Sequence, residues 1–340
     1  MSKMNDRLKS TLIFFLKLVV TLVPTYFVCK NIVMAPDWSV NDLYTLFSAH
    51  SVWPLFVALL CLGLSNFTAC LQWKLLLEKQ DVKLRYGHLL KLYYVGLFFN
   101  NFMPGNVGGD AKKVYDIRKQ GGQDTVGAGL TATFFDRLFG LYFITLFALA
   151  VGLLFFMHDE AQRAFMWPSL WIFLGFCTLF ASLFSRRLGG LVCKILSLVF
   201  PEKINSRLIH MFGRFQQFRS MKLWVSISGL SAVTQGLRIL VHYFCGIAVG
   251  VDLSISWYFY YIPLVAIVSA LPISIGGFGP RELLAQSLFA RAGVPGLESV
   301  VIQLLAYLVS LVLSLFGAFV FLLGGTPATS TPVKTEGEPK

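Results

Sequence analysis

The stretch NNFMPGNVGGDAKKVYDIRK, from Asn100 to Lys119, interrupts an apolar segment with a proline and glycines and then turns basic. A second stretch, LPISIGGFGPRELL from Leu271 to Leu284, repeats the same Pro-x-x-[Val/Ile]-Gly-Gly core. Proline removes a backbone donor, and glycine has a freely variable backbone, so such sequences interrupt helices. The two stretches therefore predict two matched breaks in the chain.

The composition around these breaks is that of a membrane protein. Of 340 residues, 56% are hydrophobic and 14% are charged, and the mean hydropathy is +0.68. So few polar residues cannot cover a soluble protein of this size. Two apolar runs, Leu89–Met103 and Trp257–Ile275, are interrupted at the breaks. Six others approach the roughly 20 residues that cross a bilayer: Thr11–Met34, Val52–Leu71, Val126–Phe156, Trp167–Phe184, Leu223–Val249 and Val300–Leu323.

Positive charge alternates between the connections of these runs. The net charge is +12, and Lys and Arg precede the first span and follow the second and the fourth, whereas the other connections are nearly bare of them. Cytoplasmic connections are the ones rich in Lys and Arg. We therefore expect a multi-pass protein of the cell inner (plasma) membrane with both termini in the cytoplasm. The basic connection 185–222 favours anionic lipids at the cytoplasmic face, and we expect no nucleic-acid partner.

The interrupted runs are predicted to form re-entrant hairpins. Leu89–Met103 has basic residues on both sides, so both flanks belong in the cytoplasm and the chain enters the membrane and returns. Irregular backbone at membrane depth is tolerated where it is buried in protein or lines a cavity, so the break should face a cavity. Asp110 is expected to be the N-cap of a helix to about Lys119, and Pro280 suits the first position of the next helix.

The positions of the breaks predict an internal repeat. Pro104 and Pro272 are 168 residues apart, and this offset carries the second span onto the fifth and the third onto the sixth. Each half has three spans, an odd number, so the second half is inverted. We predict an all-α polytopic membrane protein, an inverted repeat of about six full spans and two re-entrant helical hairpins, eight hydrophobic segments in all. Residues 1–156 form the first repeat, with a cytoplasmic-side hairpin at about 88–119. Residues 157–323 form the second, with an outer-side hairpin at about 257–292, and residues 324–340 form a disordered tail.

The candidate substrate site lies where the two repeats meet. Inverted-repeat transporters bind substrates there, near discontinuous helices, and helix N-termini bind phosphate. Arg238 is the best single candidate for a lipid phosphate, because a charge within a span is costly and a guanidinium binds two oxygens at once. A structural partnership of Arg238 with Asp136 or Glu282, and close helix packing by the glycines, are the alternatives. The candidate substrate-binding residues are Asn101, Pro104, Gly105, Asn106, Gly108, Gly109, Asp110, Lys112, Lys113, Asp136, Arg137, Arg238, Pro272, Ser274, Gly276, Gly277, Gly279, Arg281 and Glu282.

The sequence predicts no catalytic residue, metal site or cofactor. The five histidines are scattered, and the six cysteines lie within or beside apolar runs without a C-x-x-C pair. Such cysteines are small core residues and not disulfides or metal ligands. His242 is expected to be a satisfied core residue. No ATP-binding motif is present, and the spacing of GNVGGD does not match a phosphate-binding loop.

The two quoted motifs together resemble the membrane region of the lysylphosphatidylglycerol synthetase/flippase family and its stand-alone flippase-like relatives, over Leu12 to Leu323. The resemblance implies lipid translocation between leaflets, with two re-entrant elements around a central cavity. In the synthetases a soluble aminoacyl-transferring domain follows the membrane region. Only a short tail follows here, so lipid aminoacylation is not expected of this chain.

We therefore expect a non-enzymatic flippase that moves an anionic or phosphate-bearing phospholipid or glycolipid between leaflets. Two alternatives stay open. One is a membrane-embedded enzyme that modifies lipids, and the other is a membrane adaptor subunit for a lipid glycosyltransferase. The sequence also leaves open a partner lipid-synthesising enzyme and a homo-oligomer.

Overall fold

The structure, a computed structural model, describes residues 18–30, 32–33, 51–102, 108–121, 124–184, 194, 216–218, 220–270, 274 and 277–323. These residues form helices and turns, and no strand occurs among them. A first helix, Leu18–Lys30, comes before the labelled ones. The helices that follow are α3 (Val52–Glu78), α4 (Tyr86–Phe102), α5 (Gly108–Gly121), α6 (Asp124–Phe155), α7 (Glu160–Phe184), the short 3-10 helix η2 (Gln216–Phe218), α10 (Met221–Ala248), α11 (Ile255–Ala270), α12 (Pro280–Arg291) and α13 (Gly296–Leu322).

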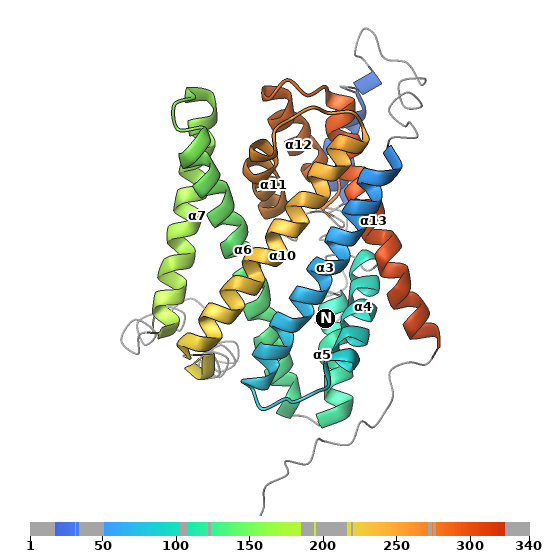
Figure 1. The fold of residues 1–340 in the computed structure, drawn as a ribbon, viewed down its shortest axis with the longest axis vertical. Helices are drawn as coiled ribbons and strands as arrows, with labels where there is room; N and C mark the ends of the chain where they lie inside the picture. Colours follow the sequence, from blue (N-terminus) through green and yellow to red (C-terminus); the bar gives the residue numbers. More distant parts are fainter. Residues whose placement is uncertain are drawn as a thin grey trace, which may run out of the picture.

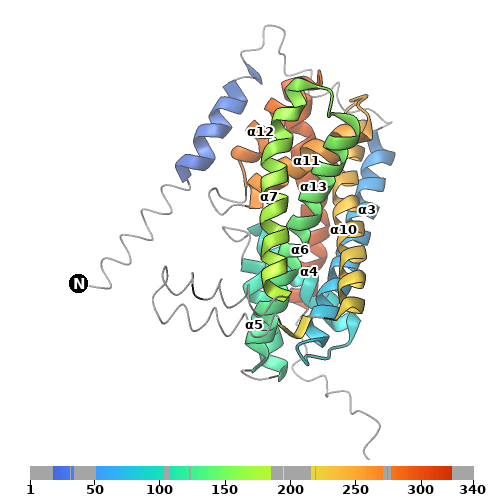
Figure 2. The same ribbon diagram turned by 90° about the vertical axis from the view of Figure 1, so that its left-hand side faces the viewer.

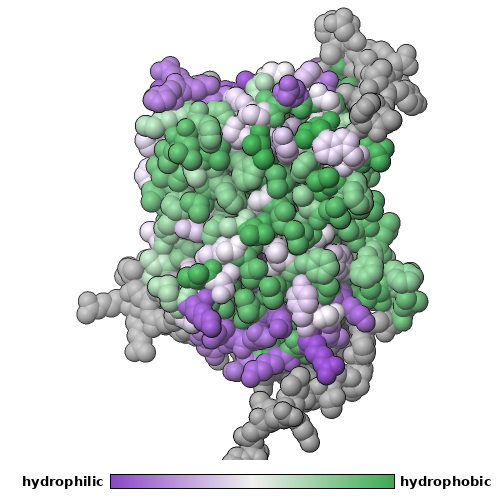
Figure 3. All heavy atoms as spheres, viewed as in Figure 1, coloured by the Kyte–Doolittle hydropathy of each residue, from purple (hydrophilic) through white to green (hydrophobic). Residues whose placement is uncertain are grey.

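Five of these helices, α3, α6, α7, α10 and α13, are long and apolar enough to cross a membrane. Their outward faces carry large apolar side chains, such as Phe56, Leu60 and Leu64 on α3. On the surface these residues form a hydrophobic band between two hydrophilic ends (Figure 3). The predicted all-α polytopic class is therefore confirmed. Of the first predicted span, Thr11–Met34, only residues 18–30 and 32–33 are among the described residues.

Two long helices, α3 and α10, lie side by side at the centre of the molecule (Figure 1). They run in opposite directions, because the hydroxyl of Ser51, before α3, donates a hydrogen bond to the carbonyl of Ala248 at the end of α10, at 2.6 Å. α4 and α5 lie in the lower half of the molecule, and α11 and α12 lie in the upper half (Figures 1 and 2). α7 packs against α6 at one side.

The first break separates α4 and α5, which form an antiparallel hairpin. α4 ends at Phe102, close before the predicted break at Pro104, where a proline disfavours helical backbone in the residue before it. The backbone N–H of Gly109 donates a hydrogen bond to Oδ1 of Asn100 at 2.8 Å. A side chain at Gly109 would overlap the carbonyl of Gly96, so this glycine lets the two helices approach closely. That the hairpin enters the membrane and returns stays a prediction.

The expected N-cap at Asp110 was wrong. α5 already begins at Gly108, which places Asp110 inside the first helical turn. Its carboxylate does not cap the helix but pairs with Lys113 and Arg137. The sequence placed the start of the helix too late because Asp is a favoured N-cap residue, whereas here two nearby cations hold the carboxylate.

The second break separates α11 from α12, and α12 begins at Pro280 as predicted. The turn requires glycine, because Gly277 and Gly279 have φ angles of +79° and +87°, in the left-handed region. The Glu282 carboxylate accepts a hydrogen bond from the N–H of Gly279 at 2.8 Å and so caps the helix. A side chain at Gly279 would also collide with the carbonyl of Thr21 in the first helix.

Helix bounds and helix contacts recur between the two halves. Adding the 168-residue offset to the bounds of α4, 86 and 102, gives 254 and 270, against 255 and 270 for α11. α4 packs against α13 and its counterpart α11 against α6; likewise α5 packs against α6, and α12 against α13. Because α3 and its counterpart α10 run in opposite directions, these matched contacts support an inverted repeat. The repeat boundaries stay a prediction.

Two hydrophobic clusters rich in aromatic residues hold the helices together. One contains Trp73, Phe135 and Phe139 and lies where α3, α4, α6 and α10 meet. The other contains Tyr258 and Phe289 and joins α11 and α12 to α10 and α13. Lipid tails are as apolar as these side chains, so the hydrophobic effect does not drive helices together within a bilayer. Close packing of this kind stabilises the helix contacts instead. The polar cavities described next lie among the helices that these two clusters hold.

Candidate functional site

Two cavities lie among the central helices. The larger has a volume of about 520 Å³ and is bounded by α3, α4, α5, α6, α10 and the end of α11. The smaller, of about 300 Å³, is bounded by α3, α4, α10, α12 and α13. Leu97, Asn101 and Arg238 line both of them. The cavities therefore meet at these three residues, of which only Arg238 is charged.

Arg238 lies well inside α10, and the hydrogen bonds of its guanidinium to described residues go to hydroxyl groups. Its Nε donates to Oγ of Ser65 at 3.2 Å, and its Nη2 lies 3.5 Å from the hydroxyl of Tyr93. Among the described residues no carboxylate forms an ion pair with it. The alternative role of Arg238, a structural partnership with Asp136 or Glu282, is thus not met by a direct ion pair: Asp136 bonds to Gln72, and Glu282 pairs with Arg281.

The larger cavity has an ionic side, formed by α5 and α6. The Asp110 carboxylate pairs with Lys113, at 3.4 Å, and with Arg137. The Lys113 ammonium group is buried and lies 4.1 Å from the centre of the Tyr93 ring and 5.5 Å from that of Trp73. Asp110 lies in α5, outside the five helices that are long enough to span the membrane. Burial tends to raise the pKa of Asp110, but the charges of Lys113 and Arg137 outweigh it and hold that pKa below its usual range.

Asp136 lies in α6 on the wall of the same cavity. Its Oδ1 accepts a hydrogen bond from Nε2 of Gln72 at 2.8 Å. No described cation lies within ion-pair distance of Asp136. The cavity is thus lined by three cations, Lys113, Arg137 and Arg238, and two carboxylates.

The smaller cavity carries its own cation, Arg281 at the start of α12. The Arg281 guanidinium pairs with Glu282 and lies 4.9 Å from the centre of the Phe278 ring. His242 lines this cavity, and its Nδ1 is 3.1 Å from the carbonyl oxygen of Arg238. That contact agrees with the expected role of His242 as a satisfied interior residue.

The structure gathers part of the predicted site around the two cavities. Six candidates line the larger one: Asn101, Asp110, Lys113, Asp136, Arg137 and Arg238. Arg281 lines the smaller one, and its partner Glu282 lies behind it. Candidates that line neither are Gly108, Gly109, Lys112, Ser274, Gly277 and Gly279. Five more fall outside the described residues: Pro104, Gly105, Asn106, Pro272 and Gly276.

Lys112 does not share the environment of Lys113. Its ammonium group forms an ion pair with Asp116, one turn further along α5, and lies 5.5 Å from the centre of the Phe321 ring. Consecutive residues of a helix point about 100° apart, so only one of the two lysines can face the cavity.

Neutral polar residues make up much of the cavity walls, and the sequence reasoning missed them. Those in the larger cavity are Gln72, Asn100, Ser231, Thr234 and Gln235, and the smaller cavity adds Asn66, Gln303 and Ser310. Each lies in a helix whose residues are mostly apolar. A polar side chain inside an apolar span is a signal of the same kind as a charge, although weaker, and it could have identified them.

Comparison with known proteins agrees with this architecture. Residues 14–317 match the family model described as the lysylphosphatidylglycerol synthase TM region. The chain is also similar to a UPF0104 membrane protein of Methanothermobacter thermautotrophicus, at 23% identity over 287 residues, or 74% of this chain and 78% of that protein. The family description supports a role connected with membrane lipids. Because the match covers most of its length, the chain belongs to the lysylphosphatidylglycerol synthase membrane-region family.

Proposed function

We propose that this protein is a lipid transporter, which moves an anionic or phosphate-bearing phospholipid or glycolipid between leaflets without changing it covalently. The single observation that carries the proposal is Arg238. It lies where the two cavities meet, within a predicted span, and it is bonded to hydroxyl groups instead of a carboxylate.

The energetics of a buried guanidinium favour an anionic ligand at this place. A charge inside a membrane is costly unless it faces a polar cavity or a partner. Hydroxyl groups compensate only part of that cost, whereas a phosphate diester accepts two parallel hydrogen bonds from the guanidinium and neutralises its charge. A lipid headgroup that reaches Arg238 from either cavity therefore gains its strongest contact halfway across.

Lys113 and Arg281 suit the approach to this central position. They are 168 residues apart, the offset of the repeat, so they occupy equivalent places in α5 and α12. Each already has a carboxylate partner and lies against aromatic rings. Because their charges are partly neutralised, each would bind a phosphate more weakly than Arg238 and would release it more easily. Asp136 can act as the counter-charge for Arg238 when no headgroup is bound.

Exposed charges support the proposed orientation, with the lower end of Figure 1 in the cytoplasm. Lys79, Lys83 and Arg85 are exposed between α3 and α4, whereas Asp159 and Glu160 are exposed where α7 begins, at the other end. In a variant without the native cysteines, Tyr115→Cys, exposed on α5, should react with a membrane-impermeant maleimide only in inside-out vesicles. Labelling in right-side-out cells would reverse the orientation.

Reconstitution separates this function from its alternatives. The purified chain is placed in liposomes that carry labelled anionic lipids in one leaflet only, and both the leaflet and the chemical identity of the label are followed. Movement of unchanged lipid supports the transporter. A new lipid species would instead indicate an enzyme, and neither movement nor product would leave the adaptor role.

A further inference from the structure

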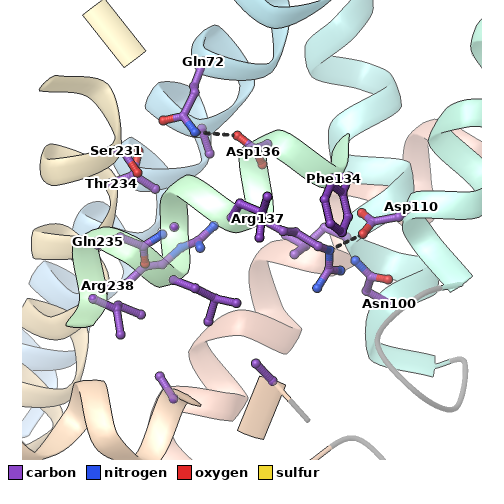
Figure 4. Close-up of a pocket in the computed structure, with 18 of the residues that line it drawn as sticks. Gln72, Asn100, Asp110, Phe134, Asp136, Arg137, Ser231, Thr234, Gln235 and Arg238 are labelled. Carbon is purple, nitrogen blue, oxygen red and sulfur yellow. Dashed lines mark hydrogen bonds and ion pairs between the residues drawn. The ribbon is translucent and has the colours of Figure 1, made fainter. Parts of the chain in front are cut away.

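The larger cavity has a second side with a different chemistry. On the side away from Asp110, most of its wall is neutral and polar (Figure 4). Gln72 of α3 contributes an amide to this side, and α10 contributes Ser231, Thr234 and Gln235. Ser231, Gln235 and Arg238 are four and three residues apart, so they share one face of α10. This polar stripe leads directly to the central guanidinium.

Three atoms of the neutral side lack a hydrogen-bond partner among the described residues. They are Oε1 of Gln72, Oγ of Ser231 and Oε1 of Gln235. The three residues are only 3%, 1% and 5% exposed. Buried polar atoms are nearly always paired, and leaving one unpaired costs about 1–3 kcal/mol. Polar atoms in this state, in the wall of a cavity, indicate a ligand that pairs with them.

The neighbouring helix α6 leaves room for the amide of Gln235. A Cβ at Gly140 of α6 would lie only 2.7 Å from Nε2 of Gln235. With any other residue at this position, the amide would have to shift. The missing side chain of Gly140 thus leaves room for the Gln235 amide in the wall of the cavity.

We propose that this neutral side binds hydroxyl groups, so that the transported lipid carries a polyol or a sugar on its phosphate. A hydroxyl both donates and accepts, and therefore satisfies the amide oxygens and the serine alike. An ammonium headgroup could also donate to those oxygens, but it would meet the cations Lys113, Arg137 and Arg238 in the same cavity. The inference rests on the proposed function, because it names the lipid class that Arg238 holds by its phosphate.

Lipids that differ only in hydroxyl groups test this inference. Phosphatidylglycerol and phosphatidylpropanol have the same single negative charge and nearly the same size, but only the first has hydroxyl groups on its headgroup. With one-leaflet label in proteoliposomes, phosphatidylglycerol or phosphatidylinositol should move about 10-fold faster than phosphatidylpropanol, or more, since a polar site rejects analogues that leave it unpaired. Equal rates for phosphatidylglycerol and phosphatidylpropanol would overturn this inference and leave the proposed function standing. Faster movement of phosphatidylethanolamine also overturns it, and movement of no lipid overturns the proposed function together with it.

Variants on α10 link the selectivity to these atoms. Gln235→Leu and Ser231→Ala should each lower the ratio of the phosphatidylglycerol rate to the phosphatidylpropanol rate towards one. Thermal unfolding of each purified variant in detergent reports whether the variant is folded. The matched control is Ser226→Ala, on the exposed face of α10, where the hydroxyl donates to the Lys222 carbonyl at 2.9 Å. Full selectivity in both Gln235→Leu and Ser231→Ala would contradict the assignment.

A soluble polyol phosphate offers the same chemistry as such a headgroup. Calorimetry with glycerol 3-phosphate and the detergent-solubilised chain, read together with the transport assay, distinguishes a soluble ligand from a lipid headgroup. Binding of glycerol 3-phosphate together with movement of phosphatidylglycerol supports a headgroup site. Binding of glycerol 3-phosphate without any lipid movement would assign the cavity to a soluble ligand and overturn the lipid class.

Discussion

At the scale of single residues, the two adjacent lysines of α5 have different roles. Lys113 is buried at the larger cavity between Asp110 and the Tyr93 ring. Lys112 points away from the cavity and pairs with Asp116. The residues have the same charge and lie in the same helical turn, so a difference between their variants reports on position and not on charge.

Replacing these lysines one at a time should separate their contributions. We expect Lys113→Gln to lower the rate of lipid transport about 10-fold, because a hydrogen bond to a charged group contributes about 1.5–3 kcal/mol. Lys112→Gln should stay within about twofold of the wild-type rate, since Lys112 does not line the cavity and its ammonium group pairs with Asp116 instead. The measurement is translocation in proteoliposomes at matched protein content. Equal losses in both variants would show that Lys113 has no special place in transport.

The charged members of the site could be predicted from the sequence, whereas the neutral ones were not. Asp136, Arg137 and Arg238 stand out because a charge inside an apolar run needs a cavity or a partner, and all three line the larger cavity. Gln235 interrupts its run just as clearly but carries no charge, and its role depends on Gly140 of a distant helix. Such a pairing is visible only once the helices are packed.

At the scale of helices, the α4–α5 hairpin depends on one close approach. Gly96 and Gly109 bring the two backbones so near that a Cβ on Gly109 would overlap the Gly96 carbonyl. The Gly-Gly pair of the first motif therefore serves packing at Gly109, whose N–H is already bonded to Asn100. The hairpin in turn fixes Asp110 and Lys113 at the cavity.

Adding one methyl group to this contact should loosen the hairpin. Gly109→Ala is expected to destabilise the protein by about 1–3 kcal/mol, the usual cost of overpacking a tight contact. The matched control is Gly87→Ala in α4, where an added Cβ meets no atom within 4 Å; alanine there favours the helix. Thermal unfolding in detergent, followed by tryptophan fluorescence, compares the two. A midpoint for Gly109→Ala equal to that of Gly87→Ala would contradict the proposed close contact.

The sequence predicted the two breaks better than the helices that follow them. α4 and α11 end just before Pro104 and Pro272, because a proline restricts the residue before it. The start of α12 at Pro280 was also predicted correctly. The start of α5 was not, because the choice of Asp110 considered capping alone and not the pairing of its carboxylate with Lys113 and Arg137.

At the scale of the whole molecule, the two halves meet along α3 and α10. Near the middle of this contact, the hydroxyl groups of Thr68 and Thr234 are 2.7 Å apart. Thr234 also lines the larger cavity. If access to Arg238 alternates between the two cavities, the halves must move relative to each other, and this contact has to shift.

A cross-link at this point tests whether the halves move. In a variant without the native cysteines, Thr68→Cys with Thr234→Cys should form a disulfide, since the two hydroxyl oxygens that the sulfur atoms would replace are 2.7 Å apart. We expect oxidation to stop lipid transport and a reductant to restore it. Each single cysteine variant, treated in the same way, is the control. Undiminished transport in the oxidised double variant would exclude a relative movement of α3 and α10.

The two cavities meet at Arg238, which is also the proposed binding partner of the lipid phosphate. The most direct measurement is the translocation of a one-leaflet-labelled anionic phospholipid by the reconstituted chain, with Arg238→Gln compared with wild type. Glutamine keeps hydrogen-bond donors but loses the charge that holds the phosphate. We predict rapid movement with the wild-type chain and a rate at the level of protein-free liposomes with Arg238→Gln, at equal expression and thermal stability. A wild-type rate in Arg238→Gln would contradict the central claim.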